Sequence, residues 1–87
     1  MTPAEVIDKW GRMSRMAATV TAALSSTDGR VVDQGDLIEM VRNMVGGSDA
    51  PSMGAITTAI KWARKAGVPI ETFRAVGWRL NNTRETQ

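Results

Sequence analysis

The 87-residue sequence contains no cysteine and no histidine, and each absence excludes a kind of chemistry. Without cysteine the chain can form neither a disulfide nor a thiolate metal site. Without histidine it lacks the side chain that most often acts as a general base or binds a transition metal. Asp33 and Asp36 could form a carboxylate pair, but helix capping explains them better. We therefore expect a protein that is not an enzyme and that needs no metal, cofactor or small-molecule substrate.

Long hydrophobic runs are also missing from the sequence. No stretch approaches the roughly 20 apolar residues that a membrane span needs. The acidic residues Glu5 and Asp8 come early, and no apolar run follows a basic one as in a signal peptide. These features predict a cytoplasmic protein that does not bind a membrane. The length predicts one domain over residues 1–87, with a frayed tail at residues 82–87.

Apolar periodicity and capping signals indicate helices throughout the chain. Thr2 and Glu5 are spaced as a capping box, and Asp33 is placed as the N-cap of a second helix. Gly46 and Gly67 stand where helices commonly end in a left-handed residue. Nothing in the sequence indicates a strand, so we predict an all-α fold, a small four-helix bundle-like domain. The expected helices lie near residues 3–25, 33–45, 52–66 and 69–81.

The first expected helix carries an apolar stripe with alternating spacings of four and three residues. The stripe consists of Val6, Trp10, Met13, Ala17, Val20 and Leu24. Such a stripe is either the core face of a bundle helix or the seam of a coiled-coil dimer. A chain this short, with no disulfide or metal to stabilise it, gains stability from association. We therefore expect a homodimer, with this stripe as the leading interface.

Charge is distributed unevenly along the chain. Residues 1–50 hold five basic and seven acidic side chains, whereas residues 51–87 hold six basic and two acidic ones. A basic half joined to an acidic half indicates an anionic partner for the basic half, although ordinary solvated surface would look the same.

Residues 63–73 read ARKAGVPIETF, which is similar to the A-x-x-x-G-V-S-x-x-T-V stretch of lac-repressor-type motifs. On these residues the segment from Ala59 to Trp78 resembles the helix-turn-helix family of DNA-binding motifs. In the resemblance, Ala63 is the small residue where two helices cross and Gly67 is the turn. Trp62 and Ala66 precede them as buried positions of the first helix, and Phe73 and Val76 are buried positions of the second.

This resemblance implies a helix-turn-helix-like C-terminal half that places residues 69–81 in the DNA major groove. Its outward residues would include Glu71 and Arg74, which are polar enough to read bases. The motif also places Ile70 outward, whereas the apolar spacing of the expected helix at residues 69–81 places it inside. The basic residues of this half would contact phosphates. Together with the outward residues of the motif, they make up the expected nucleic-acid-binding set: Lys61, Arg64, Lys65, Glu71, Arg74, Trp78, Arg79 and Arg84. The expected function is a small DNA-binding regulator of transcription.

A protein-binding module is the alternative function. A short helical chain without catalytic residues also fits an inhibitor, adaptor or assembly factor, of the kind that phages and other mobile elements encode, which would act by occluding a partner's surface. Trp10 or Trp78 would then anchor the interface, because tryptophan is enriched in interface hot spots. The six methionines either fill gaps in a small core or line an adaptable binding surface.

Overall fold

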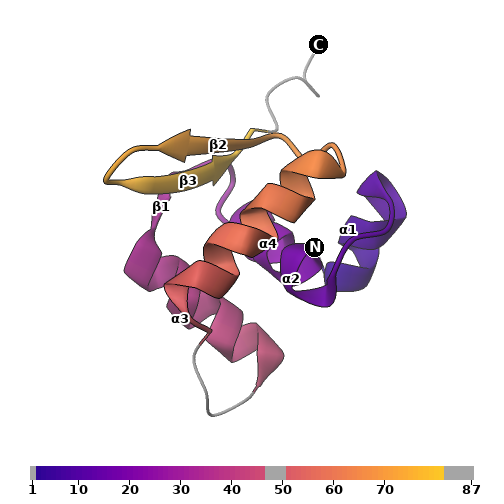
Figure 1. Cartoon of the computed structure of the whole chain (residues 1–87), viewed down its shortest axis with the longest axis horizontal. Helices are drawn as coiled ribbons and strands as arrows, with labels where there is room; N and C mark the ends of the chain where they lie inside the picture. Colours follow the sequence, from indigo (N-terminus) through magenta and orange to yellow (C-terminus); the bar gives the residue numbers. More distant parts are fainter. Residues whose placement is uncertain (1, 47–50, 82–87) are drawn as a thin grey trace.

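The computed structural model describes residues 2–46 and 51–81 of the chain (Figure 1). Four helices and three short strands follow one another along these residues. Their bounds, in chain order, are α1 (Pro3–Trp10), α2 (Arg15–Ser25), β1 (Val32–Asp33), α3 (Gln34–Val45), α4 (Met53–Lys65), β2 (Ile70–Phe73) and β3 (Gly77–Leu80). The fold is therefore mixed α and β, and the all-α prediction is wrong.

The expected fourth helix at residues 69–81 is a β-hairpin formed by β2 and β3. Apolar residues of this segment fit a helical spacing, but they also fit the two-residue period of a strand: Trp78 and Leu80 are buried and Arg79 between them is not. The segment is rich in β-branched and aromatic residues, which favour strands. The overlap of the two periods over so few residues explains the incorrect prediction.

The expected first helix at residues 3–25 is divided into α1 and α2. Gly11 ends α1 with a φ of 104°, a left-handed region that favours glycine. Ser14 then begins α2, because its side chain accepts a hydrogen bond from the Ala17 backbone amide at 3.1 Å. The apolar stripe continues across this break, which is why periodicity alone did not reveal it.

The capping signals of the other helix ends are confirmed. Thr2 and Glu5 form both bonds of the capping box at the start of α1. Asp33 accepts a hydrogen bond from the Asp36 amide at 2.8 Å, so these two carboxylates belong to the cap of α3. Gly46 ends α3 in the left-handed conformation, and its neighbours Gly47 to Ala50 lie outside the described residues.

The end of α4 is a Schellman motif around Gly67, the glycine at which the sequence predicts a helix end. Val68 donates its backbone amide to the Ala63 carbonyl at 3.1 Å, and Gly67 donates to the Arg64 carbonyl at 3.0 Å. Gly67 has a φ of 104°, and Val68 is buried. The chain therefore leaves α4 in a fixed direction and enters β2 after only a few residues.

Helix α2 lies at the centre of the molecule and packs against α1, α3 and α4 (Figure 1). Every residue of α2 from Ala17 to Leu24 is buried. The main core also takes side chains from β1, α3, α4 and the hairpin, among them Leu37, Ile56 and Leu80. A smaller cluster around Val6 joins α1 to α2.

Most of the N-terminal stripe that was expected as a dimer seam lies inside this core, and its Trp10 and Met13 are partly buried against it. Val6, Ala17, Val20 and Leu24 are each completely buried within the chain. The core-face interpretation of the stripe is therefore correct, and a second copy of the chain could not pack on these side chains.

The three strands form one antiparallel sheet with the order β1-β3-β2. β3 lies in the middle: Val32 of β1 pairs with Trp78, and Thr72 of β2 pairs with the same residue from the other side. Gly77 allows the close approach of β1, since a Cβ atom there would lie 1.9 Å from the Val32 carbonyl oxygen. This contact links the C-terminal hairpin to the start of α3.

Candidate nucleic-acid interface

Helix α4 has one buried face and one exposed basic face. Its buried side chains are Ile56, Ala59, Ile60 and Ala63, which lie on one face of the helix. The opposite face is exposed and contains Lys61, Arg64 and Lys65, and no acidic residue occurs anywhere in the helix. The packing of α4 on α2 therefore orients its three cations towards solvent.

The β2–β3 hairpin lies beside α4 and is bonded to it. The Arg64 guanidinium donates to the Thr72 hydroxyl at 3.3 Å, which connects the basic face of the helix to β2. An open groove of about 550 Å³ lies between the two elements. The residues that line it are Thr57, Ile60, Lys61, Arg64, Lys65, Thr72 and Trp78.

The outer face of the hairpin carries a cross-strand ion pair. Arg79 bonds to the Glu71 carboxylate through Nε at 2.8 Å and also through Nη2. The Arg79 guanidinium also lies 5.5 Å from the centre of the Phe73 ring. The charge of Glu71 is therefore compensated within the hairpin, and the Arg79 guanidinium already has Glu71 and the Phe73 ring as neighbours.

The turn of the hairpin is exposed and basic at its tip. Val76 donates its amide to the Phe73 carbonyl at 3.0 Å, which closes the turn over Arg74 and Ala75. Arg74 is exposed there and has no ion pair among the described residues. Phe73 and Val76 on either side are also exposed. The tip thus presents one cation flanked by two apolar side chains.

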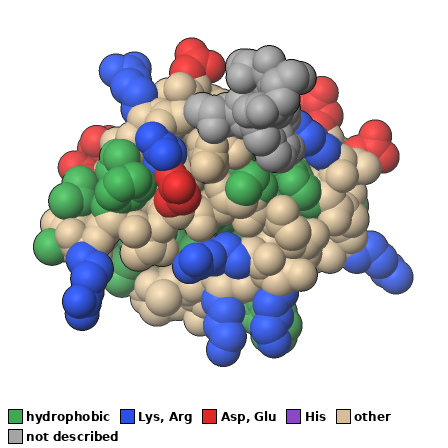
Figure 2. All heavy atoms as spheres, turned by 90° about the horizontal axis from the view of Figure 1, so that it is seen from above, with side chains coloured by type: hydrophobic (Ala, Val, Ile, Leu, Met, Phe, Trp, Pro, Cys, Tyr) green, Lys and Arg blue, Asp and Glu red, His purple; other side chains and the backbone are tan. Residues whose placement is uncertain are grey.

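The surface over α4 carries positive side chains without negative ones, whereas the rest of the described surface carries both signs. Figure 2 shows lysine and arginine side chains along its lower edge, over the front face of α4 in Figure 1, with no acidic side chain between them. Acidic residues belong mainly to α1, to the loop after α2 and to the start of α3. The charge asymmetry of the sequence is therefore a property of the folded surface.

The structure brings together only some of the predicted site residues. Lys61, Arg64 and Lys65 share the exposed face of α4, and Arg74 lies at the tip of the neighbouring hairpin. Glu71 and Arg79 neutralise each other on the outer face of the hairpin. Arg84 lies outside the described residues.

Several details of the predicted motif are wrong because its second helix does not exist. Trp78 is only 7% exposed and belongs to the core, so it is not an outward contact residue. Ile70, placed outside by the motif, is also buried. Conversely, Trp62 is 49% exposed, although the motif placed it inside, and Phe73 and Val76 are exposed as well. Arg74 belongs to a turn between strands and not to the start of a helix.

Sequence reasoning missed three exposed residues of α4 that belong to the same surface. Thr57, Thr58 and Trp62 lie on the sides of the helix not occupied by the buried stripe. The signal was present: the stripe from Ile56 to Ala63 already defines which residues of the helix point outward. It was overlooked because the motif assigned the outward role to the following segment.

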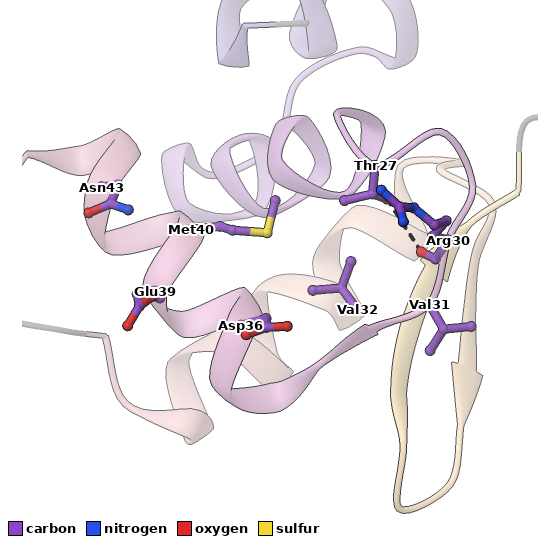
Figure 3. A pocket seen from close by; sticks show the side chains of 8 residues that line it. All are labelled: Thr27, Arg30, Val31, Val32, Asp36, Glu39, Met40 and Asn43. Carbon is purple, nitrogen blue, oxygen red and sulfur yellow. Dashed lines mark hydrogen bonds between the residues drawn. The ribbon is translucent and has the colours of Figure 1, made fainter.

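A second hollow, of about 350 Å³, lies where the loop after α2 meets α3 (Figure 3). Arg30 lies on the loop side, while Asp36 and Glu39 lie along α3, so its wall mixes both signs of charge. The Thr27 hydroxyl donates to the Arg30 carbonyl at 3.3 Å. Among residues 2–46 and 51–81, no group of three or more acidic side chains is placed to hold a metal ion.

The capping box at the start of α1 perturbs the ionisation of its glutamate. The Thr2 backbone amide donates a hydrogen bond to Glu5 and lowers the pKa of that carboxyl, and this bond belongs to the cap of α1.

No described helix is long and apolar enough to span a bilayer. Comparison with protein-family models, with curated proteins and with solved structures found no match to this chain. Any functional assignment must therefore come from the surface itself.

Proposed function

We propose that this chain is a non-enzymatic DNA-binding domain that inserts α4 into the major groove and places the β2–β3 hairpin beside it on the sugar–phosphate backbone. The single observation that carries the proposal is the exposed face of α4. It has Lys61, Arg64 and Lys65 and no acidic residue, and it is flanked by a hairpin with Arg74 at its tip.

The order of the elements supports this proposal. Helices α3 and α4 follow each other along the chain as the two helices of a helix-turn-helix pair do, α2 packs against both of them, and the hairpin after α4 pairs with a strand before α3. This order is similar to that of a winged helix, in which the second helix of the pair is presented outward. Since one fold can serve many functions, the charge of α4 is needed in addition to the topology.

The dimensions of α4 suit the major groove. Its 13 residues make a helix about 20 Å long, and a helix with side chains is about 10–12 Å wide. The major groove of B-DNA is about 12 Å wide, so one helix fills it. Lys61 and Lys65 would then contact phosphates, while Thr57 and Thr58 are the exposed uncharged polar residues that can reach base edges.

The proposal is tested by fluorescence anisotropy with a mixed-sequence DNA duplex at several salt concentrations. Each lysine that neutralises a phosphate contributes about 0.9 to the slope of log K against log salt. We expect Lys61→Ala and Lys65→Ala each to lower that slope by about 1. Arg30→Ala, in the loop after α2, should leave it unchanged because Arg30 lies on the side of the acidic residues Asp36 and Glu39.

Absence of duplex binding at about 50 mM salt would contradict the proposal, since non-specific phosphate attraction is strong under these conditions. If Arg30→Ala and Lys61→Ala lower the salt slope equally, α4 is not the helix that contacts DNA. Circular dichroism of each variant verifies that the fold is retained.

A protein-binding function is the second candidate, and the apolar side chains at the hairpin tip favour it. Phe73 and Val76 are exposed on either side of Arg74. The anchor expected at Trp78 is not accessible, because that side chain is buried. If a protein is the partner, Val76→Asp should abolish its binding, whereas Lys61→Ala should have little effect.

Association into a homodimer remains a prediction. Val6, Ala17, Val20 and Leu24 of the expected seam are buried in the core and offer no surface to a second copy. Sedimentation at micromolar concentration decides whether the chain is a dimer, and a symmetric dimer would bind two half-sites related by a two-fold axis.

A further inference from the structure

Trp62 stands exposed on the side of α4 that faces away from the hairpin. A tryptophan of which 49% is exposed is unusual in a small core-forming helix, because the side chain is large and mostly apolar. Two hollows lie on either side of it, and Ser14, in the segment between α1 and α2, lines both. The indole ring therefore forms a ridge between α4 and the start of α2.

The hollow nearer the end of α4 has two cations in its wall. Its lining residues are Arg12, Met13, Ser14, Trp62, Lys65 and Ala66. The Lys65 ammonium lies 5.1 Å from the centre of the Trp62 ring, which places a charge against the indole face. No acidic residue contributes to this wall. A hollow with arginine, lysine and an indole N–H donor matches an anion with several oxygen acceptors, such as a phosphodiester.

The position of this hollow relative to α4 defines which phosphate it can reach. A helix that fills the major groove has each of its flanks against one of the two phosphate backbones that border the groove. On one flank of α4 are Arg64 and the hairpin, bonded through Thr72. On the opposite flank are Trp62 and the segment between α1 and α2, which contributes Arg12.

We propose that Arg12, Trp62 and Lys65 form a second phosphate-binding element, which grips the DNA strand across the groove from the one that the hairpin contacts. Arg12 and Lys65 neutralise the phosphodiester, and the Trp62 indole packs on the adjacent deoxyribose and donates its N–H to a phosphate oxygen. This inference rests on the proposed function. It assigns α1, which lies outside the helix-turn-helix pair, the role of holding Arg12 beside α4.

The test measures duplex binding against salt for the full chain and for Arg12→Ala, Trp62→Ala, Lys61→Ala and the matched control Arg30→Ala. We expect Arg12→Ala to lower the slope of log K against log salt by about 1, with the Arg30→Ala slope unchanged. Trp62→Ala removes no charge, so it should weaken binding severalfold at every salt concentration without changing the slope. Circular dichroism spectra and melting curves of all variants should match the parent chain, because these side chains are exposed or partly exposed.

The possible outcomes separate this inference from the function on which it rests. If Lys61→Ala lowers the slope but Arg12→Ala and Arg30→Ala both leave it at the parent value, α4 binds DNA without the α1–α2 segment and the inference is overturned. It is also overturned if Trp62→Ala binds as tightly as the parent chain. If the parent chain itself does not bind duplex DNA at about 50 mM salt, the proposed function fails, and this inference fails with it.

Discussion

Helix α3 carries its own boundaries in its sequence, whereas the β2–β3 hairpin takes its position from residues far away in the chain. α3 begins at an aspartate that caps it and ends at a left-handed glycine. These are local interactions, because each bond joins residues only three or four positions apart. The hairpin instead depends on Val32 of β1, which pairs with Trp78 across more than half of the chain.

The comparison shows why local patterns succeed in one region and fail in the other. A cap satisfies backbone groups that a helix leaves free, so it marks the helix end in any surrounding structure. A strand satisfies its backbone only when a second strand lies beside it, and nothing in residues 77–80 identifies that partner. The hairpin is therefore stabilised by tertiary contacts, and substitutions of its buried residues should be the more damaging ones.

The largest expected effect is that of Trp78→Ala. Trp78 is buried in the main core together with Val32 and Leu80, and removing a buried aromatic side chain leaves a cavity. We expect a loss of about 3–5 kcal/mol in the free energy of unfolding. Trp62→Ala, the matched change at an exposed tryptophan, should cost less than about 1 kcal/mol. Urea denaturation followed by circular dichroism measures both, and equal losses would show that the hairpin is not part of the core.

Gly77→Ala tests the close approach of β1 and β3 directly. The added methyl group would overlap the Val32 carbonyl oxygen, so the strands must separate or the backbone must shift. We expect a destabilisation of about 1–3 kcal/mol, measured by the same denaturation.

Gly35→Ala supplies the control for that variant. Gly35 is exposed in α3, and a methyl group there would meet only ordinary contacts. Alanine is the better helix former, so this change should raise stability by about 0.5–1 kcal/mol. If both glycine variants shift stability in the same direction, the pairing of β1 with β3 is not what requires Gly77.

Most of the helical part of the fold could be predicted from the sequence. The caps at Thr2 and Asp33, the glycines at the ends of α3 and α4, and the buried stripe residues Ala17, Val20 and Leu24 of α2 were all readable locally. The break at Gly11 and the hairpin were not. An apolar stripe that continues across a break looks unbroken, and a short segment can satisfy the periods of a helix and a strand at once.

The candidate site was predictable in composition but not in arrangement. The basic residues of α4 were identified from charge, and the structure places them on one exposed face. The motif nevertheless assigned groove contact to residues 69–81, because A-x-x-x-G-V is also the sequence of a Schellman ending followed by a buried residue. What that stretch encodes here is the exit of the chain from α4, with Val68 in the core.

The smallest expected effect concerns the tip of the hairpin, where local and tertiary requirements conflict. Ala75 has a φ of 63°, a left-handed conformation that costs a residue with a Cβ atom about 1–2 kcal/mol. Ala75→Gly removes that strain but gives the unfolded chain more freedom, so the net gain should be about 0.5–1 kcal/mol. The same substitution in a helix, Ala4→Gly in α1, should instead cost roughly 0.5 kcal/mol, because glycine lowers helix stability. Thermal melting measures both, and opposite shifts are expected. A lower melting temperature for Ala75→Gly would mean that the turn is not held in the left-handed conformation, and that the direction in which Arg74 is presented is not set by the backbone of the tip.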